Sequence, residues 1–110
     1  MTQETISKLE AKLRDSAALS PETRQELLEL LGQLKSEVTE LSRSNAAQAE
    51  SIAGHTEFST REAIREEKNP ELLQRSLDDL SASVTGFEKS HPKLVEVVNR
   101  IATTLSNLGI

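Results

Sequence analysis

Residues 20–44 read SPETRQELLELLGQLKSEVTELSRS and carry a clear helix signal. Ser20 can cap a helix, Pro21 lacks the N–H that would be unpaired in a first turn, and Glu22 suits the positive end of the helix. Large apolar side chains then recur on one helix face: Leu27, Leu28, Leu30, Leu31, Leu34, Val38 and Leu41. The pattern predicts a helix from Pro21 to at least Ser44, with a broad apolar arc that narrows to a seam.

The end of the chain repeats this pattern. Adding 67 to each of the seven apolar positions above gives another seven: Leu94, Val95, Val97, Val98, Ile101, Leu105 and Leu108. They predict a helix over about 91–108. Because both helices have a wide apolar arc in their first half, we expect both to be central, with two neighbours at one end and one at the other.

Two more helices are expected, over about 3–18 and 70–89. Their apolar positions also follow helical spacing: Ile6, Leu9, Leu13 and Ala17 in the first, and Leu73, Leu77, Leu80, Val84 and Phe87 in the second. Asn69-Pro70-Glu71 and Ser90-His91-Pro92 mark helix starts, since proline disfavours the α conformation in the residue before it. The apolar phase nevertheless runs on through His91, so one Pro-kinked helix over 70–108 is the alternative.

Residues 45–68 look weakest in helix-forming pattern. The narrow apolar seam of the helix predicted from Pro21 would continue through two polar positions, Asn45 and Gln48, before it reaches Ile52. Several alanines favour helix, and Phe58-Ser59-x-x-Glu62 fits a capping box before a short helix over 60–68. We therefore expect a mobile connector with marginal helix.

The last residues carry a stop signal of their own. Gly109 stands where a left-handed residue would end the final helix, and Ile110 where it would pack back on Leu105. We expect this end to close the core.

Composition excludes several classes of function. The chain has 110 residues, enough for a single domain over 1–110. It has 13 basic and 18 acidic residues and a net charge of −5, so nucleic acid is not an expected partner. It has no cysteine, and no stretch approaches the length and apolarity of a membrane span. We expect a cytoplasmic protein that does not insert into membranes.

No arrangement of residues indicates catalysis. His55 and His91 lie in different segments without further ligands at helical spacing, so no metal is expected. The acidic pairs, such as Asp78 with Asp79 and Glu66 with Glu67, are adjacent in sequence. Adjacent side chains point to different parts of a helix surface. We therefore expect no enzyme, no catalytic residue and no cofactor.

The expected fold is all-α, with four antiparallel helices in two hairpins, and dimerisation is one way to complete the bundle. The apolar arcs are wider than one hairpin partner covers, which favours a self-associating helical module, most simply a dimer. The alternative is a regulatory adaptor that binds an amphipathic helix of a partner protein. The candidate helix-packing or interface residues are Leu27, Leu31, Leu34, Val38, Leu41, Leu73, Leu77, Leu80, Val84, Phe87, Leu94, Val98, Ile101, Leu105 and Leu108.

The C-terminal third also resembles a known family. Phe87-Glu88-x-Ser90-His91-Pro92-x-Leu94, followed by an aliphatic helix that ends Leu105-Ser106-Asn107-Leu108-Gly109-Ile110, resembles the bacterial domain-of-unknown-function family numbered four thousand four hundred and four. Residues 6–41 are similar to this family in pattern only. The resemblance implies a bacterial origin and a shared helical fold, and it implies no activity.

Overall fold

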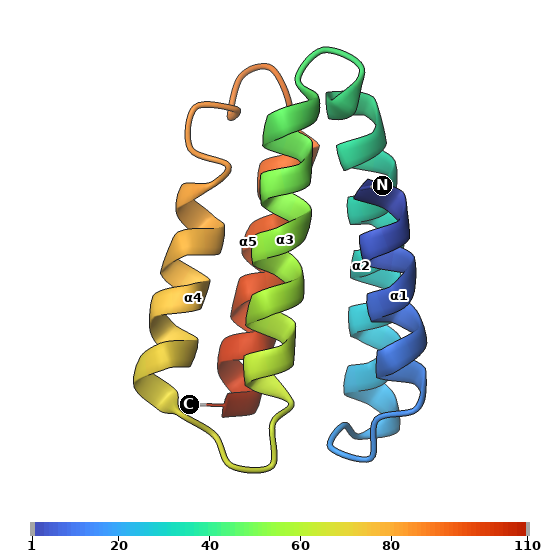
Figure 1. The fold of residues 1–110 in the computed structure, drawn as a ribbon, viewed down its shortest axis with the longest axis vertical. Helices are drawn as coiled ribbons and strands as arrows, with labels where there is room; N and C mark the ends of the chain where they lie inside the picture. The colour runs from blue at the N-terminus through green and yellow to red at the C-terminus, as the bar shows by residue number, and fades with distance from the viewer. Residues whose placement is uncertain (1, 110) are drawn as a thin grey trace.

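The computed structural model describes residues 2–109 and is all-α, as the sequence predicts (Figure 1). The described residues form five helices, which are α1 (Thr2–Arg14), α2 (Pro21–Ser42), α3 (Ala46–Ala63), α4 (Pro70–Ala82) and α5 (Pro92–Gly109). The expectation of four helices is therefore wrong, because the segment expected as a connector forms α3. None of the described helices has the length and apolarity needed to cross a membrane.

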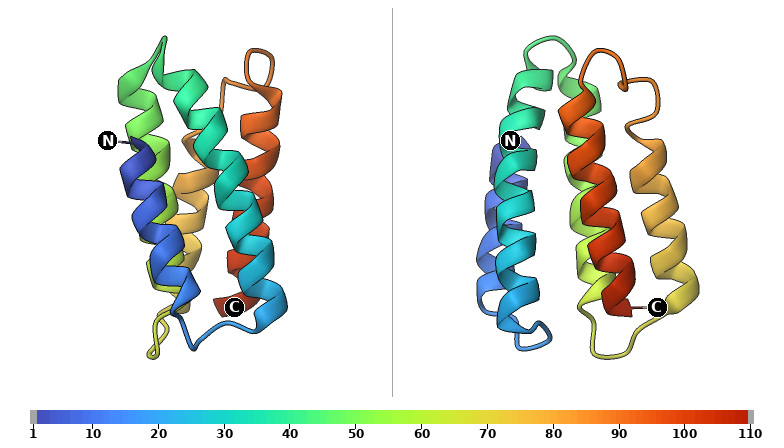
Figure 2. Two further views of the ribbon diagram at one scale, coloured as in Figure 1. Left: turned by 90° about the vertical axis from the view of Figure 1, so that its right-hand side faces the viewer. Right: turned by 180° about the vertical axis from the view of Figure 1, so that it is seen from behind.

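Consecutive helices run in opposite directions along a molecule of 38 × 26 × 21 Å (Figures 1 and 2). Helices α2, α3 and α5 contact one another, α1 lies on α2 and α3, and α4 lies on α3 and α5. Helix α3 alone contacts all four others. The wide apolar arcs of α2 and α5 are thus covered within the chain, where we had expected a second chain to cover them.

Two of the predicted helix starts, at Pro21 and Pro70, are confirmed together with their caps. Ser20 accepts a hydrogen bond from the backbone N–H of Thr23 at 3.2 Å, and Asn69 accepts one from Leu72 at 3.1 Å. Each cap satisfies one N–H that a first helical turn leaves unpaired. Proline is the first residue of α2, α4 and α5. Local side-chain chemistry therefore sets where these helices begin.

Helix α3 stands where we expected a connector, and its buried face is built mainly from small side chains that let it pack between the other helices. Ala49, Ala53 and Ala63 are buried, as are three hydroxyl residues, Thr56, Ser59 and Thr60, and only Ile52 adds a large apolar group. A helix surrounded by four others needs such a face, since large side chains would hold the neighbours apart. A pattern of large apolar positions predicts the other helices but does not reveal this one.

The buried hydroxyls of α3 are all hydrogen-bonded. Thr56 donates to the carbonyl of Ile52, and Thr60 donates to that of Thr56, each at 2.8 Å. Ser59 donates to the carbonyl of Ser76 in α4 at 3.0 Å. The short helix expected over 60–68 is also wrong, because Ser59 lies inside α3 and joins two helices rather than capping one. Burial of these polar groups therefore leaves none of their hydroxyls unpaired.

Helix α4 ends at Ala82 rather than near Lys89, and the alternative of one kinked helix over 70–108 is wrong. Gly86 has a φ of +100°, and its N–H donates to the carboxylate of Glu88 at 2.7 and 3.0 Å. Val84 is still buried, although it follows the helix. Val84 and Phe87 continue the helical spacing of the apolar residues in α4, but this spacing reflects burial in the loop rather than a longer helix.

The two ends of the chain also differ from expectation. Helix α1 ends at Arg14 and not near residue 18, and Arg24 donates to the carbonyls of Ser16 and Leu19 in the turn that follows. Gly109 is the last residue of α5 rather than a residue beyond it. The expected contact of Ile110 with Leu105 lies outside the described residues.

We expect the backbone amides of α3 to exchange slowly with deuterium, because the helix is packed by four neighbours. This reverses our sequence-based expectation of a mobile segment. Hydrogen exchange with mass spectrometry or NMR measures it, with the loops 64–69 and 83–91 as the fast-exchanging comparison. Exchange in α3 as fast as in these loops would contradict the central packing of the helix.

Ala53→Leu should destabilise the fold by about 1–3 kcal/mol, because the larger side chain overpacks the face that touches the other helices. Ala53 is 1% exposed. The matched control is Ala46→Leu, at an exposed position of the same helix, which should change stability little. Urea denaturation compares the two, and equal midpoints would show that α3 is loosely packed.

Candidate interaction surface

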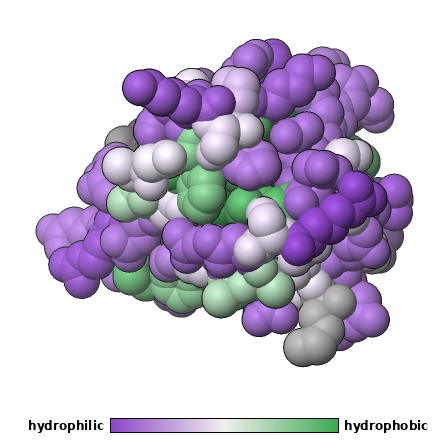
Figure 3. Space-filling view, turned by 90° about the horizontal axis from the view of Figure 1, so that it is seen from above, coloured by the Kyte–Doolittle hydropathy of each residue, from purple (hydrophilic) through white to green (hydrophobic). Residues whose placement is uncertain are grey.

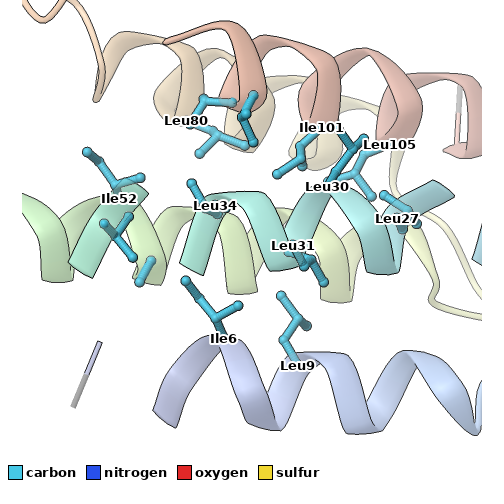
Figure 4. Packing of buried hydrophobic residues seen from close by; sticks show 14 of the residues in the cluster. Ile6, Leu9, Leu27, Leu30, Leu31, Leu34, Ile52, Leu80, Ile101 and Leu105 are labelled. Atoms are coloured by element: carbon cyan, nitrogen blue, oxygen red, sulfur yellow. The ribbon is translucent and has the colours of Figure 1, made fainter. Parts of the chain in front are cut away.

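The candidate interface residues form the core of a single chain. Thirteen of the fifteen are buried, and the other two, Phe87 and Leu108, are partly buried against the same cluster. Figure 4 shows side chains of this cluster, among them Leu34 of α2, Leu80 of α4 and Ile101 of α5. These residues pack helices together inside the chain, and a partner cannot reach the buried ones in this structure. A surface that binds a partner would therefore consist mainly of other residues.

The family-like element Phe87-Glu88-x-x-His91-Pro92 builds the turn between α4 and α5. The rings of Phe87 and His91 lie 5.8 Å apart at 58°, and the N–H of His91 donates to the carbonyl of Phe87 at 2.8 Å. The Glu88 carboxylate accepts the hydrogen bond from Gly86 described above. These contacts give Phe87, Glu88 and His91 a role in shaping the loop, and Pro92 begins α5.

No cluster of candidate metal ligands is present in the part of the chain that the structure describes. Its histidines, cysteines, aspartates and glutamates form no group of three that could hold a metal ion. The least exposed ion pair joins Glu10 of α1 to Lys35 of α2 at 2.6 Å. That pair ties two helices together and lies in none of the surface hollows described below.

The surface hollows lie mainly along α5 and are lined by mixed side chains. The hollow between α4 and α5 has a volume of about 350 Å³, with Leu77 and Ala102 among polar residues such as Gln74, Asn99 and Thr103. A second hollow, between α2 and α5, has a volume of about 240 Å³ and is lined mostly by polar and charged groups. Small-molecule sites are mostly apolar clefts with a few polar groups, which these hollows do not resemble.

The end of the bundle that carries the α4–α5 loop offers no broad apolar platform. Seen from this end, a small hydrophobic area is enclosed by hydrophilic side chains (Figure 3). Phe87 in the loop is half-buried, and Val84 is buried. The hydrophobic side chains here therefore serve the core more than a docking surface.

The outward side of α3 differs from the rest of the surface. Phe58 is 47% exposed and is the one large hydrophobic side chain among residues 2–109 that is exposed. It is one of five exposed residues that follow one another along one face of α3, at steps of three, four, four and three residues. We call these the outer stripe of α3: Ala47, Glu50, Gly54, Phe58 and Arg61.

Gly54 adds a second unusual feature to the outer stripe. It lies in the middle of a helix, where glycine is less stable than alanine by about 1 kcal/mol. A Cβ atom at this position would meet nothing within 4 Å, so no contact inside the chain requires a glycine. Since residues four apart are neighbours on a helix surface, Gly54 leaves a flat area beside the Phe58 ring.

The sequence pattern alone does not mark this surface. It assigned Phe58 only to the flank of a capping box in a connector, because α3 itself was not expected. The usable signal was a lone aromatic residue one helical turn after a glycine, in a segment otherwise rich in helix-forming alanine. That signal has meaning only once the segment is known to be helical.

Comparison with known proteins gives one match. The model of a family described as a domain of unknown function, DUF4404, matches residues 29–110. This range covers most of the chain, including α3, α4, α5 and the turn between α4 and α5. No curated protein and no solved structure matches the chain.

A chelator should leave the thermal stability of the protein unchanged, because the two histidines are not placed with further metal ligands. Melting curves followed by circular dichroism with and without EDTA measure this. A melting temperature that falls by several degrees with EDTA and recovers when zinc is added would contradict the prediction.

Proposed function

The chain belongs to the DUF4404 family, whose description records no activity, and we propose a function for it from its surface: a non-enzymatic helical module that binds protein, most simply a second copy of itself. The observation that carries this proposal is the exposed Phe58 on the outer stripe of α3. Aromatic side chains are enriched at the centres of protein interfaces, because they bury a large area with few rotatable bonds.

The core of the single chain is already complete, so the association we propose joins two folded chains at their surfaces. A dimer that completes a core would be obligate, and its chains would not fold alone. Here the five helices already share one hydrophobic cluster, so a partner would bind at the surface of a folded chain. Interfaces of this kind are small and typically transient.

The non-enzymatic part of the proposal is supported by the site chemistry. His91 lies against an aromatic ring in a turn, and the described hollows lack an apolar cleft with converging polar groups. A net charge of −5 also favours a protein partner over nucleic acid, which acidic surfaces repel.

An adaptor that binds an amphipathic helix is the second candidate. The hollow between α4 and α5 supports it, because Leu77 and Ala102 line it and it lies along the helices. Its largely polar lining is less suited to the apolar face of a helix than the hydrophobic grooves that bind such ligands. We therefore rank self-association first.

We also propose that the protein works in the bacterial cytoplasm. The support is the family membership, taken with the bacterial origin that the sequence resemblance implies. Fractionation of a bacterium that carries the protein tests the location, and recovery with the membrane or outside the cell would contradict it.

Sedimentation equilibrium of the full chain from micromolar to millimolar concentration tests self-association. We expect the average mass to rise with concentration from 12.1 kDa toward twice that value. Circular dichroism across the same range should stay helical, because the monomer is expected to be folded. A constant mass of one chain would contradict self-association, and binding of an amphipathic helix by that monomer would favour the adaptor.

A further inference from the structure

We propose that the outer stripe of α3 pairs antiparallel with the same stripe of a second copy, so that Phe58 of each chain packs over Gly54 of the other. This inference rests on the proposed function and identifies the surface and the partner. The partner is a second copy because the stripe carries both a protruding ring and the flat area that would receive it.

The spacing of the stripe fits a two-fold axis. In a symmetric dimer the same patch is used by both chains, and each contact occurs twice. On a helix paired antiparallel with itself, facing residues are equidistant from one midpoint. Gly54 and Phe58 are equidistant from position 56, and Glu50 and Arg61 are equidistant from the same point to within one residue. One axis therefore matches both pairs.

Charge on the stripe favours the same arrangement. Glu50 is exposed and takes part in none of the four ion pairs between described residues. The Arg61 side chain is 55% exposed and lies 3.6 Å from Glu57, a distance and exposure at which the pair is weak. Antiparallel pairing places Glu50 of one chain near Arg61 of the other, twice.

A parallel pair would be opposed by the same charges. It would place Glu50 beside Glu50 and Arg61 beside Arg61, and like charges across an interface are unfavourable. It would also set the two Phe58 rings against each other and leave both Gly54 positions unfilled. The antiparallel arrangement alone uses the flat area and both charges.

Gly54 gives this proposal its independent support. The helix is less stable for having glycine at this position, and the chain itself gains no close contact from it. A side chain there would project from the stripe and hold a second helix away from it. A Cβ atom at Gly32 of α2 would also meet nothing within 4 Å, but Gly32 is half-buried and has Lys35 and Ser36 where Gly54 has Phe58.

Charge reversal tests the register directly. Glu50→Arg and Arg61→Glu should each weaken dimerisation by about tenfold or more in sedimentation equilibrium, because each places like charges together twice. The double variant Glu50→Arg/Arg61→Glu should dimerise as the unchanged chain does, since it restores both pairs and the net charge of −5. The matched control is Asp79→Arg, at an exposed position of α4, which alters net charge as Glu50→Arg does and should not weaken the dimer.

The flat area is tested by a matched pair of substitutions. Gly54→Leu should abolish dimerisation and Gly32→Leu should not, while circular dichroism confirms that both variants are folded. Phe58→Gln should weaken the dimer by about tenfold or more through loss of the buried ring.

Each outcome distinguishes this inference from the proposed function. If the unchanged chain dimerises and none of the stripe variants weakens the dimer, the surface is wrong and self-association stands. Single reversals that weaken the dimer without recovery in the double variant overturn the antiparallel register. A chain that stays monomeric at every concentration overturns self-association itself, and this inference with it.

Discussion

The close packing of α3 against four other helices is the constraint on which the structure depends. Such a helix must present small side chains over much of its circumference, and its face of alanine, serine and threonine meets this requirement. Polar groups are admitted to the interior because Thr56 and Thr60 donate to carbonyls of their own helix and Ser59 donates to α4. With α3 in place, the wide apolar arcs of α2 and α5 are covered within one chain.

Much of the fold could be predicted because its signals are local. Ser20-Pro21 and Asn69-Pro70 specify helix starts through capping and proline geometry, which do not depend on the rest of the chain. Helix α3 could not be predicted in the same way, because the value of a small side chain lies in how closely the neighbours approach. The end of α4 was missed for a related reason, since Val84 is buried without being helical.

The outer stripe of α3 is less predictable from the sequence than the fold is. The apolar positions that suggested an interface, such as Leu31 and Val98, are core residues whose covering helix was not recognised. Phe58 and Gly54 gain significance only together, on one side of a helix whose opposite side is buried. The outer stripe of α3 is the part of this helix that remains exposed after internal packing is complete, and a pattern of hydrophobic positions does not reveal it.

The lack of aromatic side chains in the core has a consequence for the near-ultraviolet spectrum of the protein. Every buried hydrophobic side chain among the described residues is aliphatic, while Phe58 is exposed and Phe87 is only partly buried in a loop. The chain has no tryptophan and no tyrosine. Near-ultraviolet absorption and circular dichroism therefore come from these two rings, and the buried aliphatic side chains contribute nothing in this range. A change in these signals reports on the outer stripe of α3, which carries Phe58, or on the α4–α5 loop, where Phe87 packs against the edge of the core.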